Sequence, residues 1–135
     1  MRTATPILIA FGFISAAPAA SLTIDQMQGN RRVLIITAPG ASDARLIEQR
    51  RILTKWKQGA DERDVSVVEV IDDQVHGAGD NASKLRRLRH LPLHRFAVVL
   101  IGKDGHEAVR SKEPLTGKAL SDRIDAMPMR RAGRR

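Results

Sequence analysis

Four polar residues that could bind a ligand follow the first apolar segment of the chain: Ser42, Asp43, Arg45 and Gln49. That segment, residues 33–37, is a continuous run of β-branched and aliphatic side chains, the pattern of a buried strand. Ser42 or Asp43 can cap a following helix, whose free N–H groups and partial positive charge can hold an anion. Arg45 and Gln49 share one helical face at the carboxyl edge of the strand, where open α/β sheets bind ligands. This strand-to-helix corner is therefore a candidate anion or peptide site. The alternative is that Asp43 only caps the helix and pairs with Arg45, while Gln49 reaches a backbone carbonyl.

A second acidic pair, Asp72 and Asp73, follows another apolar segment, residues 65–71. If the two strands are parallel, their carboxyl ends lie at the same edge and Asp72 joins the candidate site. Two carboxylates are few for Ca²⁺, which takes six or more oxygen ligands, so the alternative role is turn capping. An enzyme of non-thiol chemistry would use Asp43, Arg45 and Gln49 with Asp72. No nucleophile or base stands out among them.

Several classes of chemistry are excluded or disfavoured by residue type. The chain has no cysteine, so thiol–disulfide exchange by its own residues is excluded. His90 and His94 have the i, i+4 spacing of a zinc pair, but Pro92 lies between them and no third ligand is evident. No phosphate loop, dinucleotide fingerprint or hydrolase signature is present. We predict no metal site and no cofactor.

The chain is basic, with a formal net charge of +8, and its densest basic segment is residues 84–95. On a helix its leucines, Leu85, Leu88 and Leu91, face inward. The outward side chains form a candidate basic patch, Lys84, Arg86, Arg87 and Arg89. Such a face is commonly just solvated; the alternative is contact with an acidic envelope protein or polymer. Nucleic acid is disfavoured because base stacking needs aromatic side chains, and only Phe11, Phe13, Trp56 and Phe96 are present.

The pattern along the chain predicts an α/β fold. The expected order is a strand at 33–37, a helix from the corner to Gln58, a strand at 65–71, a helix ended by Pro92, a strand at 96–102, a hairpin at Asp104-Gly105, a strand at 107–110, and a helix capped by Thr116. Alternation at the start predicts parallel pairing through right-handed crossovers. We therefore expect a thioredoxin-like, four-stranded mixed sheet of order β-α-β-α-β-β-α, with helices on both faces.

The first nineteen residues have the features of a secretory signal: Arg2, the apolar run 6–14, and small residues at 17–19. We expect cleavage after Ala19 or Ala20; the alternative is an uncleaved anchor, for which the apolar run is short. The predicted organisation is a signal at 1–19, a linker at 20–31, a thioredoxin-like domain at 32–128 and a basic tail at 129–135. The mature chain would then be periplasmic or secreted, with no transmembrane span.

Three segments resemble a known family: RVLIITAPGASDARLIEQRR, RFAVVLIGKDGHEAVRS and RIDAMPMRR. They closely resemble the domain of unknown function 4174, a family of small exported bacterial proteins with related domains in vertebrate sushi-repeat-containing extracellular proteins. The resemblance implies similarity to thioredoxins and peroxiredoxins, and no particular reaction. Aligned on a thioredoxin motif, the two cysteine positions fall on Ala41 and Ala44; aligned on a peroxiredoxin motif, the threonine position falls on Asp43 and the cysteine position on Leu46. Neither alignment places a thiol.

These features predict an exported binding or accessory module of the cell envelope, without redox activity. The alternative is an enzyme of non-thiol chemistry at the corner.

Overall fold

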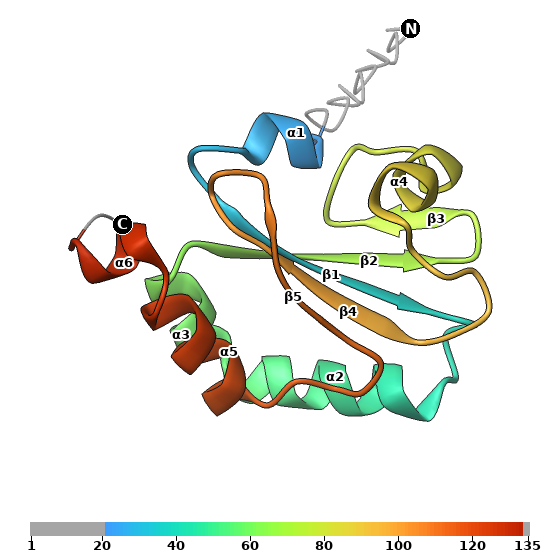
Figure 1. Cartoon of the computed structure of the whole chain (residues 1–135). Helices are drawn as coiled ribbons and strands as arrows, with labels where there is room; N and C mark the ends of the chain where they lie inside the picture. Colours follow the sequence, from blue (N-terminus) through green and yellow to red (C-terminus); the bar gives the residue numbers. More distant parts are fainter. Residues whose placement is uncertain (1–20, 134–135) are drawn as a thin grey trace, which may run out of the picture.

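The computed structural model describes residues 21–133 and places them around one five-stranded mixed sheet (Figure 1). Its strands are β1 (Arg32–Ala38), β2 (Val65–Ile71), β3 (Gln74–His76), β4 (Ala97–Ile101) and β5 (Glu107–Ser111), in the spatial order β3-β2-β1-β4-β5. As predicted, β1 and β2 are parallel. The β1–β4, β2–β3 and β4–β5 pairs are antiparallel.

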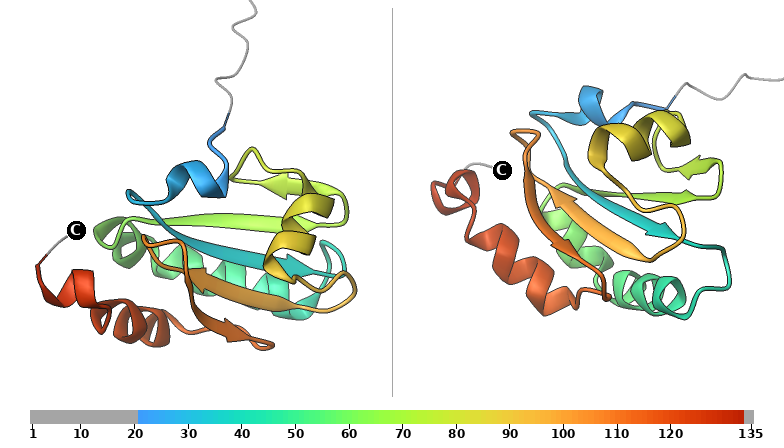
Figure 2. Two further views of the ribbon diagram at one scale, coloured as in Figure 1. Left: turned by 45° about the horizontal axis from the view of Figure 1, so that its top comes forward. Right: turned by 45° about the vertical axis from the view of Figure 1, so that its right-hand side comes forward.

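Helices cover both faces of the sheet (Figure 2). Their bounds are α1 (Ile24–Met27), α2 (Ala44–Lys55), α3 (Lys57–Glu62), α4 (Ala82–Arg89), α5 (Gly117–Asp125) and α6 (Pro128–Arg131). One apolar cluster joins α1 and α4 to the sheet, and a second joins α2, α3 and α5 to the opposite face. Because side chains alternate along a strand, β1 supplies Val33 and Ile35 to the first cluster, and Leu34 and Ile36 to the second. A strand covered on both sides must be apolar throughout, which explains the unbroken run in the sequence.

The sheet has one strand more than predicted. β3 pairs with β2 through a two-residue turn at Asp72 and Asp73, in which Ile71 lies opposite Gln74 and Asp72 has a φ of 53°. Aspartate tolerates this left-handed conformation better than most residues. The strand was missed because it has three residues and only Val75 in it is apolar.

The predicted linker is also structured in its described part. Thr23 and Gln26 form a capping box that starts α1. Ile24 and Met27 are buried in the apolar cluster beneath α4. A single helical turn with two apolar residues is too short for periodicity to reveal it. The predicted signal, residues 1–19, lies outside the described residues.

The predicted long second helix is two helices. α2 ends at Lys55, Trp56 leaves helical geometry with φ −95° and ψ 10°, and α3 follows. Gly59, which directly follows the predicted end of the helix at Gln58, lies inside α3 against the Trp56 indole, and a Cβ there would come within 2.3 Å of Nε1. Glycine is required by this close approach, because any larger residue would displace the indole.

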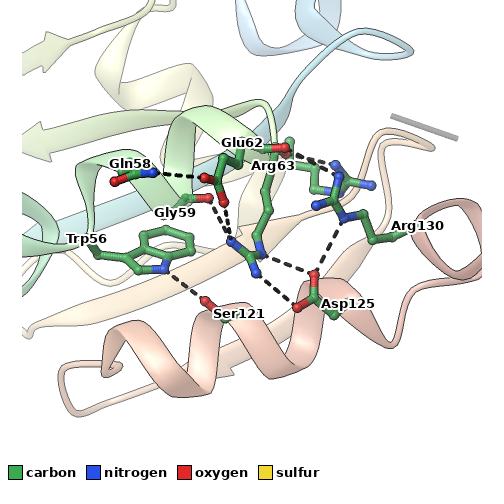
Figure 3. A network of polar contacts seen from close by, with 9 residues as sticks. Trp56, Gln58, Gly59, Glu62, Arg63, Ser121, Asp125 and Arg130 are labelled. Carbon is green, nitrogen blue, oxygen red and sulfur yellow. Dashed lines mark hydrogen bonds and ion pairs between the residues drawn. The ribbon is translucent and has the colours of Figure 1, made fainter. Parts of the chain in front are cut away.

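The expected basic tail begins as α6, which packs against the domain. The Arg130 Nη1 donates to the Glu62 carbonyl at 3.3 Å, and its Nε lies 3.5 Å from Asp125 Oδ1. Figure 3 shows Arg63 and Arg130 directed at Asp125 from either side. The α5 prediction is confirmed: Thr116 caps it, and Leu120 and Ile124 are buried.

Candidate functional site

The strand-to-helix corner is capped in the way the alternative interpretation predicts. Asp43 Oδ1 accepts hydrogen bonds from the N–H groups of Arg45 and Leu46, at 3.0 and 3.1 Å. These bonds use the carboxylate to satisfy backbone donors that the first turn of α2 would otherwise leave free.

Arg45 pairs with Glu113, beyond the end of β5, rather than with Asp43. Its Nε and Nη2 donate to the two carboxylate oxygens of Glu113 at 3.0 and 3.1 Å. This hydrogen-bonded pairing lowers the pKa of Glu113 and raises that of Arg45. The pair lies in solvent and joins α2 to the loop between β5 and α5.

Gln49 is fully buried, and its side-chain amide holds the same loop through two hydrogen bonds. Its Nε2 donates to the Leu115 carbonyl at 3.0 Å, and its Oε1 accepts from the Leu115 N–H at 2.8 Å. The sequence alternative anticipated a bond to a carbonyl. The structure adds the second bond, so both ends of the amide are occupied.

A cleft of about 500 Å³ lies beside this corner. One wall is the corner itself, with Pro39, Asp43 and Arg45. The others are the α4–β4 connection and the start of β4, residues 90–92 and 94–97, and the end of β5 with its following loop, residues 110–113. The corner thus lines a concave site, as open α/β sheets favour. Of the other predicted site residues, Gln49 lies behind the wall, and neither Ser42 nor Asp72 lines the cleft.

The cleft is cationic through residues that the sequence analysis did not select. Arg95 and Lys112 are exposed on it, and within residues 21–133 neither forms a hydrogen bond or ion pair through its side chain. Arg110 also lines it but is engaged by Glu107 and by the carbonyls of Arg89 and His90. The signal that could have found Arg95 and Lys112 is the Asp-Gly hairpin, because its register pairs Val98 with Ser111 and so brings the start of β4 to the end of β5.

His90 and His94 both line the cleft. α4 ends at Arg89, and His90 is its C-cap in the left-handed conformation, with φ 52°. The helix therefore ends before Pro92, the residue predicted to end it. Within the described part of the chain no three His, Asp or Glu side chains are grouped as a metal site would need.

A comparison with family models shows to which protein family this chain belongs. Residues 23–133 match the model of a domain of unknown function, DUF4174. The chain belongs to the DUF4174 family. This DUF4174 domain has no cysteine anywhere in its sequence, so the cleft offers no thiol.

The domain is also similar to vertebrate proteins. It is 31% identical over 121 residues to the sushi repeat-containing protein SRPX of Rattus norvegicus and to SRPX2 of Bos taurus, and 29% identical to SRPX2 of Homo sapiens. These matches cover 83% of the chain and 26% of each relative. The chain therefore spans about a quarter of the length of the curated relatives it matches. No helix among residues 21–133 is long and apolar enough to span a membrane.

The predicted basic patch of the DUF4174 domain divides into two pairs. Lys84 and Arg87 are exposed. Arg86 and Arg89 are half-buried: Arg86 donates to the Asp72 carbonyl, and Arg89 to the Gly105 carbonyl. The prediction that all three leucines face inward is wrong for Leu88, which is 55% exposed. The helix is only eight residues long, and its inward face is filled by Ala82 and Leu85.

Removing the Arg45–Glu113 pair is expected to leave stability unchanged. Arg45→Gln deletes a solvent-exposed ion pair, and such pairs contribute little because water screens them and ordering two long side chains costs entropy. We expect the urea unfolding midpoint to match that of the wild type within error. A clear decrease would mean that this pair holds the β5–α5 loop in place of Gln49.

Proposed function

We propose that this DUF4174 domain is a thioredoxin-like, non-redox binding module that receives an acidic protein segment or acidic polymer in the cationic cleft. The observation that carries the proposal is the pair Arg95 and Lys112, which face the cleft without partners in the described part of the domain. Two free cations beside a concave surface favour anionic ligands through charge complementarity.

The thioredoxin-like assignment is supported by the arrangement of the elements. A parallel β1–β2 pair, an antiparallel β4–β5 hairpin beside β1, and helices on both faces follow the predicted order, with β3 added at the edge. The cleft then lies where β1 meets α2, the position at which catalytic thioredoxins carry their cysteines. Without a thiol, the same position is left for binding.

Binding is favoured over non-thiol catalysis because the polar corner groups are already engaged. Asp43 caps α2, and Gln49 holds Leu115 with both ends of its amide. Both ends of the Gln49 amide are occupied, and the cap takes one of the two carboxylate oxygens of Asp43. The signal pattern at residues 1–19 supports a periplasmic or secreted location, where an acidic envelope component is the corresponding partner.

The proposal is tested by binding of a fluorescein-labelled octaglutamate peptide, measured by anisotropy at low and high salt. We expect binding that weakens with salt, and at least about tenfold weaker affinity in the double variant Arg95→Glu/Lys112→Glu, because two attractive contacts become repulsive. Competition by polygalacturonate distinguishes an acidic polymer from an acidic polypeptide.

The matched control is Lys84→Glu/Arg87→Glu, which changes net charge equally on exposed residues of α4. Retained affinity in this control assigns binding to the cleft. Equal weakening in both variants would instead reflect net charge or the α4 surface. Equal binding of an octaglutamine peptide would show that negative charge is not recognised.

A further inference from the structure

A second cleft, of about 370 Å³, lies between the β4–β5 hairpin and the α5–α6 segment. It is lined by Gly102 to Asp104 and His106 to Ala108 on one side, and by Arg123 and residues 126–129 on the other, with Arg32 at its base. In Figure 1 the β4–β5 turn and α6 lie at the same end of the sheet, opposite the end at which β1 leads into α2. The two clefts share no lining residue.

Arg32 is a buried cation with unused hydrogen-bonding capacity. Arg32 is 1% exposed and lines the cleft. Nη1 donates to the Arg63 carbonyl at 2.8 Å, whereas the buried Nε has no hydrogen-bond partner among residues 21–133. Burial and the nearby Arg130 lower the pKa of Arg32. An uncompensated guanidinium in such a place is costly unless an anion binds beside it.

The carboxylates closest to Arg32 are committed to other cations. Asp64 accepts from Lys103 Nζ at 2.8 Å, and its other oxygen lies 3.8 Å from Arg31 Nη1. This group therefore leaves Arg32 without a direct ion pair.

The second carboxylate, Asp125, is shared by two arginines (Figure 3). Arg63 Nε and Nη2 donate to its oxygens at 3.1 and 3.0 Å, and Arg130 Nε lies 3.5 Å away. This network holds five cations and three carboxylates: Arg31, Arg32, Arg63, Lys103 and Arg130 against Glu62, Asp64 and Asp125. The local excess of positive charge favours an anion.

The acidic side chains on the cleft walls do not supply that anion. Glu107 is paired with Arg110 at 2.8 Å, and Asp104 accepts the His106 N–H at 3.0 Å. The rest of the wall is largely apolar, with Ala108, Ala126 and Met127 near the mouth residue Met129. Methionine adapts its shape to a bound apolar group.

We propose that this cleft binds a small organic carboxylate, whose carboxylate group pairs with Arg32 while its apolar body packs against Met127 and Met129. A planar guanidinium matches a carboxylate with two parallel hydrogen bonds. The volume is within the range of small-molecule sites that combine an apolar lining with one placed charge.

The test is calorimetric titration with octanoate, with octanamide as the uncharged control. We expect octanoate to bind and octanamide to bind at least about tenfold more weakly, because only the acid satisfies the buried guanidinium. Arg32→Met keeps the buried volume and is expected to abolish binding. Arg95→Glu/Lys112→Glu is expected to leave octanoate binding unchanged, which separates this proposal from the cationic cleft.

A second variant keeps the test decisive if Arg32→Met does not fold. Met129→Glu places a negative charge at the cleft mouth and is expected to weaken octanoate at least about tenfold. Leu93→Glu makes the same charge change at an exposed residue outside this cleft. Absence of octanoate binding to the wild type, equal binding of octanamide, full binding by Arg32→Met, or equal weakening by the two glutamate variants would each overturn the proposal.

Discussion

Gln49→Ala is expected to lower the free energy of unfolding by about 2 to 4 kcal/mol, measured by urea denaturation. The substitution removes both partners of Leu115 and leaves its carbonyl and N–H unsatisfied in a partly buried loop. It also creates a cavity at a fully buried position, which adds to the loss. The β5–α5 loop would then be released next to Glu113, on the wall of the cationic cleft.

Two further variants separate the loss of the Gln49–Leu115 hydrogen bonds from the general effect of substituting a glutamine in a helix. Gln58→Ala removes an exposed amide that contacts Glu62 at 3.1 Å, and is expected to change stability by less than about 0.5 kcal/mol. Gln49→Glu retains an acceptor for the Leu115 N–H but, when ionised, cannot donate to the carbonyl. Burial would raise the pKa of the introduced carboxyl, so the folded state would bind a proton more tightly and stability would be regained as pH falls. Equal stability of Gln49→Ala and Gln58→Ala would contradict the claim that the Gln49–Leu115 hydrogen bonds hold the loop.

The elements that the sequence predicts well are those in which one local signal suffices. The β4–β5 hairpin follows from Asp104-Gly105, since Gly105 adopts the positive φ of 84° that the turn requires. The apolar runs predict β1, β2 and β4, because strands buried on both faces admit few polar residues. At the corner, the residue types predict that Asp43 caps α2.

The remaining features depend on contacts between distant segments. Arg95 and Lys112 share a cleft only because β4 and β5 pair and the following loop is held at Leu115 by Gln49. From the sequence, Arg32 is interpreted as a polar residue that precedes the first strand, because arginine is rarely buried. In the fold it begins β1 beneath α6, and no periodicity indicates that.

Asp64→Asn is expected to destabilise the domain by about 2 to 4 kcal/mol at neutral pH, because it leaves the Lys103 ammonium buried without its partner. The Lys103 side chain is 3% exposed, and its Nζ lies 2.8 Å from Asp64 Oδ2. Asparagine preserves the shape of the side chain and tolerates the φ of 54° at this position, so the variant isolates the charge. Asp61→Asn, in an exposed pair with Lys57, is the matched control and is expected to cost less than about 0.5 kcal/mol.

The same pair predicts a pH dependence with a definite sign. The hydrogen bond from Lys103 lowers the pKa of Asp64 below its unfolded value of about 3.9. The stability it contributes is therefore complete above that value and is lost as pH falls through the lower folded pKa. The difference in unfolding free energy between wild type and Asp64→Asn should narrow over this acidic range.

The double variant Asp64→Asn/Lys103→Met tests whether the loss of stability in Asp64→Asn comes from the buried Lys103 ammonium left without a partner. If it does, removing the ammonium as well recovers stability, because no buried charge is then left without a partner. The double variant should then be more stable than Asp64→Asn alone. A double variant less stable than Asp64→Asn would mean that Lys103 stabilises the β4–β5 hairpin even without its carboxylate partner. The positive charge around Arg32 would then be tolerated for a reason other than ion pairing with carboxylates.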